Sequence, residues 1–265
     1  PWRWRQFADQ WPPDAQGRRG LILVHGFVCN RGLWNAWWPR LRQAGVPCIA
    51  VNLEPVFGSI DSYPPQIEAA VRRMTEATGR PPLLVGHSMG GLAVRAWLRD
   101  HDADARVHGV VTVGSPHHGT WLGRFGFAPN AQQMRWQSPW LLQLAAAEPA
   151  ARYRRFTCFW GHCDNIVFPA STATLPGADN RHLRGVAHVH MLDHPQVLAQ
   201  VLLKAEVYVK NSYLSHEQLR EAMVQPCDSV EETVSMLVKR YGQCASICVM
   251  PEGPMTIPYL VQKPA

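Results

Sequence analysis

A serine between two glycines is the residue of this chain best suited to nucleophilic chemistry. Ser88 lies in the pentapeptide Gly86-His87-Ser88-Met89-Gly90, after a strand-like apolar run over 83–85 and before a helix-like pattern that starts at 91. On a sharp strand-to-helix turn a serine hydroxyl points away from the sheet, and small flanking residues let the two backbones approach closely. The backbone N–H of Met89, at the start of the helix, then faces the place where an oxyanion would form.

The run Gly86-His87-Ser88-Met89-Gly90-Gly91 resembles the nucleophile elbow of α/β-hydrolase lipases and esterases, triacylglycerol lipases of bacteria among them. The resemblance covers roughly residues 18–203. It implies a mostly parallel central sheet flanked by helices, with a small cap after the sixth strand in the numbering of that fold. It also implies ester hydrolysis through an acyl-enzyme, without a metal or an organic cofactor.

The same resemblance identifies an acid and a base that would complete a triad with Ser88. Asp164 lies in a Gly-x-x-Asp-x-Ile-Val pattern that is similar to the acid loop of the family. His188 follows 24 residues later, which leaves room for a helical turn and a strand, and the order Ser, Asp, His is the one expected of this fold. His190 and His194 are the alternative bases. We favour His188, because His194 precedes a proline at an apparent helix start.

Two backbone N–H groups are expected to bind the oxyanion. The apolar run over 21–27 ends in His25-Gly26-Phe27 and is predicted to be a buried parallel strand. In the hydrolase resemblance, His-Gly at this point opens the oxyanion loop, so the N–H of Phe27 would act together with that of Met89.

Four side chains are candidates for the substrate pocket: Trp34, His87, His117 and Trp121. For Trp34, which shares one helix face with Trp37, a place in the core is the more usual alternative. The pair His117-His118 could also supply a base or a metal ligand. Adjacent histidines do not share one face of a strand or helix, and no carboxylate cluster accompanies them. We therefore interpret this pair as groups that shape a loop near the site.

Alternating strand and helix patterns predict the α/β class. Strands are expected near 21–27, 47–53, 83–85, 108–114 and 155–160, and helices near 33–44, 64–78, 92–99 and 197–203. Residues 121–150 break this alternation and are rich in Trp, Phe and Leu. They predict a small apolar cap over Ser88, at about 121–150, unless they simply complete the core.

The chain is expected to have two parts, a hydrolase domain over 1–204 and an appendage over 205–265. In the appendage, strands near 205–210 and 246–250 and helices near 215–223 and 229–241 predict a small extra α/β unit, which could recruit a partner or mediate dimerisation. Residues 1–19 are predicted to be an extended arm on the domain surface. A contact of its tryptophans with a membrane interface is the alternative.

The bulk composition suits one globular α/β domain with a full core and an appendage, at 265 residues, 46% hydrophobic and 17% charged. The net charge of +6 comes mostly from scattered arginines, which favours a solvated surface over attraction to anionic membranes or acidic polymers. No segment resembles a nucleic-acid-binding module, and no run of 18 apolar residues could span a membrane. A leader or anchor ahead of Pro1 would make the protein exported or membrane-associated.

The seven cysteines are an odd number, and most lie in apolar strand-like contexts, so buried free thiols are expected. A disulfide between Cys158 and Cys163 in an oxidising compartment is the alternative.

The expected substrate is a small-molecule ester or lipid, and the Trp-rich cap region favours acyl chains or aromatic esters over sugars and peptides. An acyltransferase that uses the same triad is the second hypothesis. A hydrolase-fold binding protein without catalytic activity is the third, although such proteins usually lack one triad member and all three positions are filled here.

Overall fold

The computed structural model describes residues 4–202, 208–222 and 224–241, and a parallel sheet forms the centre of the part over 4–202. Within these residues the strand order is β2-β1-β3-β4-β5-β6, and all neighbours are parallel. The strands are β1 (Leu21–Val24), β2 (Cys48–Val51), β3 (Leu83–His87), β4 (Gly109–Val113), β5 (Phe156–Trp160) and β6 (Asp179–His182). All residues of β1, β2 and β4 are buried, as expected of strands covered on both faces. The predicted α/β class is confirmed.

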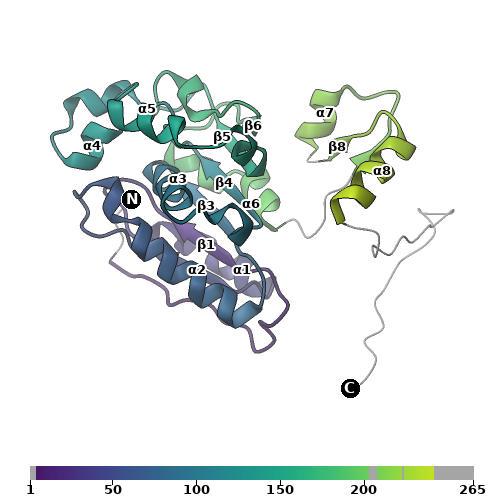
Figure 1. Cartoon of the computed structure of the whole chain (residues 1–265), viewed down its shortest axis with the longest axis horizontal. Coiled ribbons are helices and arrows are strands. Elements are labelled where there is room, and N and C mark those ends of the chain that lie inside the picture. Colours follow the sequence, from purple (N-terminus) through teal and green to yellow (C-terminus); the bar gives the residue numbers. More distant parts are fainter. Residues whose placement is uncertain (1–3, 203–207, 223, 242–265) are drawn as a thin grey trace. The chain divides into compact units, whose positions relative to one another are not determined.

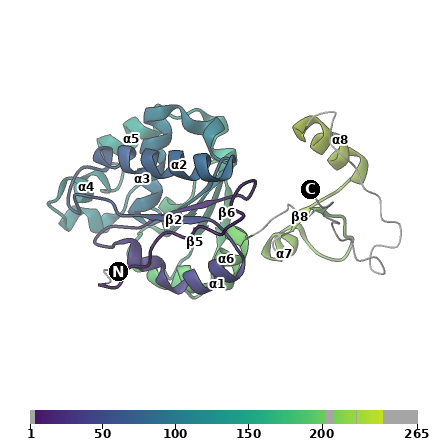
Figure 2. The same cartoon turned by 90° about the horizontal axis from the view of Figure 1, so that it is seen from below.

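Helices cover both faces of this sheet (Figures 1 and 2). Helices α2 (Pro64–Thr78) and α3 (Met89–His101) lie on one face, and α1 (Trp38–Gln43) and α6 (Pro195–Leu202) lie on the other. Each face has its own apolar core, built on α2 and α3 in one case and on Trp34, α1 and α6 in the other.

The helix expected over 33–44 is two shorter elements. A 3-10 helix, η1 (Arg31–Ala36), comes first, and α1 follows with Pro39 in its first turn. A proline has no backbone N–H and fits only the first turn of a helix, so a new helix begins there rather than continuing.

The cap segment follows β4, the fourth strand along this chain. It consists of the 3-10 helix η4 (Trp121–Phe125) and of α4 (Pro129–Gln133) and α5 (Pro139–Ala146). Met134 and Leu141 are buried in the core on the α2 and α3 side, whereas Phe125 and Phe127 are 70% and 88% exposed. The segment therefore completes one core and also presents apolar side chains to solvent.

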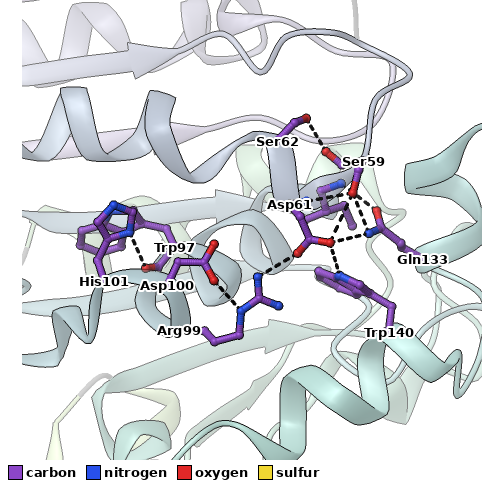
Figure 3. Close-up of polar contacts among 10 residues, drawn as sticks. Ser59, Asp61, Ser62, Trp97, Arg99, Asp100, His101, Gln133 and Trp140 are labelled. Atoms are coloured by element: carbon purple, nitrogen blue, oxygen red, sulfur yellow. Dashed lines mark hydrogen bonds and ion pairs between the residues drawn. The ribbon is translucent and has the colours of Figure 1, made fainter.

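One carboxylate ties the cap helices to the rest of the domain (Figure 3). Asp61, in the 3-10 helix η2 (Ile60–Ser62), accepts hydrogen bonds from Trp140 Nε1 at 2.8 Å and from Gln133 Nε2 at 3.1 Å. Its other oxygen accepts from Arg99 of α3 at 2.8 Å. Asp61 thus links α4 and α5 to the helix that follows Ser88.

The arm ahead of β1 packs on the domain through Gln10, which pairs antiparallel with Cys48 of β2. Trp4 is 94% exposed, and Trp2 lies outside the described residues.

Cys158 and Cys163 are free thiols, the first buried and the second exposed, so the alternative of a disulfide between them is wrong. Burial raises the pKa of the Cys158 thiol to about 12, which keeps it protonated.

The chain divides into two compact units, 1–204 and 205–265. In the second unit, β7 (Tyr208–Val209) pairs in parallel with β8 (Gln225–Pro226), and the helices are α7 (His216–Glu221) and α8 (Val230–Tyr241). The strand expected over 246–250 lies outside the described residues. Across the described ranges, no helix combines the length and the apolar character needed to cross a membrane.

Candidate active site

Ser88 lies on a strained turn between β3 and α3. Its backbone has φ 53° and ψ −126°, a conformation that costs a residue with a side chain on the order of 1–3 kcal/mol. A Cβ on Gly90 would lie 2.3 Å from the carbonyl oxygen of Val24, so only glycine lets α3 start this close to β1. Strain that the surroundings enforce at one turn is typical of a functional residue.

The turn lies where the strand order reverses. The chain adds β2 on one side of β1 and β3 on the other, so the loops after β1 and β3 diverge at the carboxyl end of the sheet. Ligands of open α/β sheets bind at such switch points. His25-Gly26 follows β1 and Ser88 follows β3, so the expected oxyanion loop and the expected nucleophile occupy this position.

Asp164 and His188 form a hydrogen-bonded pair between two loops. Asp164 Oδ2 lies 2.9 Å from His188 Nδ1, and Asp164 Oδ1 accepts hydrogen bonds from the N–H groups of Ile166 and Val167 at 2.8 Å each. Asn165 Oδ1 also accepts a hydrogen bond, at 3.3 Å, from the backbone N–H of His188. The carboxylate is therefore held on both oxygens and can fix both the orientation and the tautomer of His188.

Gly114, the residue after β4, links this pair to the turn that carries Ser88. A Cβ on Gly114 would lie 2.9 Å from His188 Nδ1 and 3.2 Å from Asp164 Oδ2. The preceding residue, Val113, accepts a hydrogen bond from the N–H of Ser88 at 2.9 Å. Among the described residues the structure shows no hydrogen bond between Ser88 Oγ and His188, a contact that often tightens only when substrate binds.

Both expected oxyanion donors lie beside Ser88. A Cβ on Gly26 would lie 2.8 Å from Ser88 Cβ, so Phe27 directly follows a residue whose backbone packs against Ser88. Met89 is the first residue of α3, where the N–H groups have no partner within the helix. The loop and the helix start are thus placed to offer one N–H each.

His25 holds the loop in this place, a role that the sequence reasoning missed. Its Nε2 accepts a hydrogen bond from the N–H of Leu53 at 2.9 Å, so Nδ1 carries the proton and donates to the Gly26 carbonyl oxygen at 2.9 Å. Burial lowers the pKa of His25 to about 4, which keeps the ring neutral near pH 7. The His-Gly pair is visible in the sequence, but the partner of His25 is Leu53, which follows a different strand, β2.

The structure separates the four expected pocket residues. Trp34 is fully buried in the core beside Trp37, and His117 is buried with its Nε2 3.0 Å from Thr112 Oγ1. His87 is 2% exposed. Of the four, only Trp121 reaches solvent, at 46% exposure. Trp34, His87 and His117 are thus as buried as Ser88 itself, and their pocket role stays a prediction.

Trp121 belongs to an aromatic cluster with Trp136 and Phe168. Its ring lies 5.5 Å from that of Trp136 and 5.4 Å from that of Phe168, centroid to centroid. The backbone N–H of Trp121 donates to the Phe168 carbonyl oxygen at 2.9 Å. Phe168 follows Asp164 by four residues, so an apolar surface adjoins the loop that carries Asp164.

The alternative bases do not contact Asp164. His194 Nδ1 accepts a hydrogen bond from the N–H of Gln196, and His190 is exposed. In the described parts of the chain, no three His, Cys, Asp or Glu side chains are grouped so that they could hold a metal ion. The groups that Ser88, His188 and Asp164 bring to this site are a hydroxyl, an imidazole and a carboxylate.

Comparison with known proteins identifies the fold of this chain. A sequence model for the alpha/beta hydrolase fold matches residues 21–156. Among solved structures, the mature Bacillus licheniformis lipase superposes with a TM-score of 0.60 at 17% identity, over 70% of this chain and 90% of that one. Aspergillus fumigatus lipase B gives 0.61 at 19%, over 70% and 52%, and a metagenomic carboxyl esterase gives 0.53 at 17%, over 65% and 64%. No curated protein sequence matches the chain.

Proposed function

The chain belongs to the alpha/beta hydrolase fold family, and we propose that it hydrolyses carboxylic esters with Ser88 as nucleophile, His188 as base and Asp164 as acid. The observation that supports this most is the Asp164–His188 pair at 2.9 Å. This pair packs on Gly114, and the preceding residue, Val113, accepts a hydrogen bond from the backbone N–H of Ser88. The lipase and esterase functions of the structural neighbours agree with this proposal, although at these identities their likeness establishes the fold alone.

The proposed reaction has two steps. Ser88 Oγ attacks the ester carbonyl carbon while His188 Nε2 takes the hydroxyl proton, and the alcohol leaves with that proton to give an acyl-serine. Water then attacks the acyl carbon, His188 takes its proton, and the proton returns to Ser88 as the carboxylic acid leaves. Asp164 stabilises the imidazolium in both steps, and it does not itself become protonated.

Stabilisation of the oxyanion comes from the N–H groups of Phe27 and Met89. Each such donor contributes on the order of 10²–10³ in rate, by analogy with a serine protease. The close approach of Gly26 and the tautomer of His25 hold the first donor, and the start of α3 holds the second.

The acyl group is proposed to bind on the aromatic cluster of Trp121, Trp136 and Phe168. These rings are 46%, 43% and 53% exposed, which leaves apolar area that a ligand can cover. Trp121→Ala should raise KM for p-nitrophenyl octanoate several-fold and leave KM for the acetate nearly unchanged. Phe127→Ala, at a ring that is 88% exposed, is the matched control.

Labelling with a fluorophosphonate tests the nucleophile directly. Wild type should gain one phosphonyl group per chain, and peptide mapping should place it on Ser88. Ser88→Ala should stay unlabelled, whereas Ser171→Ala, at an exposed serine, should label as wild type does. Labelling at another residue, or an unlabelled wild type, would contradict the proposal.

A further inference from the structure

His87 lies at the junction of three parts of the proposed site. It is the last residue of β3 and directly precedes Ser88, and its side chain is buried. Burial, and after it the nearby ring of His188, holds the pKa of His87 well below its usual range. A buried neutral ring in this place has no part in the proposed proton transfers, so its role needs another explanation.

The His87 ring packs against the ring of His188. The two centroids are 4.8 Å apart and the planes are inclined at 49°. His87 Nε2 lies 3.4 Å from the carbonyl oxygen of His188, beyond the usual range of about 2.7–3.2 Å for such hydrogen bonds. Contact between the rings is therefore the stronger interaction, and the hydrogen bond adds little.

His87 also lies against the Gly26 loop. A Cβ on Gly26 would lie 3.3 Å from His87 Nδ1 and 3.1 Å from the His87 carbonyl oxygen. Within the described ranges this Nδ1 has no hydrogen-bond partner. At this atom the ring therefore acts by packing and not by hydrogen bonding.

His188 needs support of this kind. Asp164 orients the ring through a single hydrogen bond at Nδ1, and a second contact adds to this orientation by resisting a tilt of the ring about that bond. A tilt moves Nε2 away from Ser88, and a displacement of about 1 Å can reduce the rate by roughly 10²-fold. A neutral neighbour also avoids repulsion when His188 becomes positively charged.

We propose that His87 is a positioning residue, whose ring supports the face of His188 and separates it from the Gly26 loop. This inference rests on the proposed ester hydrolysis. It assigns His87 no contact with substrate, in contrast to the pocket role expected from the sequence.

Three substitutions separate ring packing from hydrogen bonding. His87→Ala removes both and should lower kcat on p-nitrophenyl butyrate by about 30- to 100-fold, with KM within about twofold of wild type. His87→Phe keeps a ring and should restore kcat to within about fivefold of wild type. His87→Asn keeps a hydrogen-bond donor without the ring and should behave like His87→Ala. His101→Ala, at a histidine stacked on Trp97 in α3, is the control and should keep the wild-type kcat.

The rate of fluorophosphonate labelling should follow the same order, since it reports activation of Ser88 without substrate binding. The labelled fraction also counts the folded sites, so a variant that folds poorly still gives a rate per site. Wild-type kcat in His87→Ala, or rescue by Asn but not by Phe, would overturn the inference and leave the proposed function intact. An inert wild type would overturn both.

Discussion

The carboxylate of Asp164 lies 2.9 Å from Nδ1 of His188, and its other oxygen accepts two backbone N–H groups of its own loop. This carboxylate is thus rigid before substrate arrives. Replacing it with an amide keeps the shape and removes the charge that selects the tautomer of His188. Asp164→Asn should therefore lower kcat by about 10⁴-fold with little change in KM.

Steady-state kinetics at saturating ester would measure this loss, with Asp193→Asn as control because Asp193 is exposed. A loss of less than tenfold in Asp164→Asn would mean that another group orients His188.

The contact between Gly26 and Ser88 gives a steric prediction. In Gly26→Ala the new Cβ would lie 2.8 Å from Ser88 Cβ, so the oxyanion loop must move and take the N–H of Phe27 with it. The loss of one donor should lower kcat by about 10²–10³-fold. Gly109→Ala is the control, since its Cβ would meet nothing closer than 3.3 Å. If both variants keep wild-type kcat, Phe27 is not an oxyanion donor.

Asp61 should control the mobility of the cap helices α4 and α5. Asp61→Ala removes the hydrogen-bond acceptor of Trp140 and Gln133. The loss of these two hydrogen bonds should lower the stability of the cap segment by about 1 kcal/mol or more. Hydrogen exchange over 129–146 should therefore become several-fold faster. Asp100→Ala removes only the pairing with Arg99 and should leave exchange in that segment unchanged. Equal exchange in both variants would show that apolar packing alone holds the cap.

A buried ion pair should stabilise the domain beneath the cap. Arg95 binds Glu148 with two nitrogens, both side chains are fully buried, and the Tyr153 hydroxyl donates to the same carboxylate. Glu148→Gln leaves the guanidinium without a counter-charge and should lower the free energy of unfolding by about 3–5 kcal/mol. Asp179→Asn breaks the partly exposed pair with Arg181 and should cost at most about 1 kcal/mol. Urea unfolding measures the free energy of unfolding of both variants, and similar losses in the two would contradict this account.

His25 makes stability depend on pH. Its pKa is about 4 in the folded protein, against about 6.5 in an unfolded chain, so the unfolded state binds the proton more tightly. This contribution is complete above about pH 6.5 and is lost as the pH falls towards 4. It amounts to about 2 kcal/mol between pH 7 and pH 5. Urea unfolding of His25→Gln should show a correspondingly shallower loss over this interval, and an unchanged slope would contradict the assignment.

The features that the sequence predicted well have local signals. The elbow around Ser88 has its glycines within two residues, and α2 has an apolar stripe of uniform period, so both were found at their places. His188 was chosen over two near neighbours by spacing, and the structure places it alone of the three beside Asp164.

The features that were missed depend on contacts between distant segments. Nothing near His87 in the chain indicates that its ring meets a residue 101 positions away. Helical spacing placed Trp34 on a core face but left the pocket open as an alternative, and the structure packs it in the core with α1 and α6. The contacts of Asp61 with residues 133 and 140 likewise join separate elements. Residue type and spacing therefore predict which groups could react, whereas the groups that hold them in place are found only once the fold is known.

The central claim is that Ser88 cleaves esters, and the most direct test is hydrolysis of p-nitrophenyl esters from acetate to palmitate by wild type and Ser88→Ala in parallel. We expect wild type to turn over at least the short and medium esters. The variant should fall to background, since loss of a triad serine lowers kcat by about 10⁶-fold. Equal activity of the two proteins, or an inert wild type on every ester, would contradict the assignment.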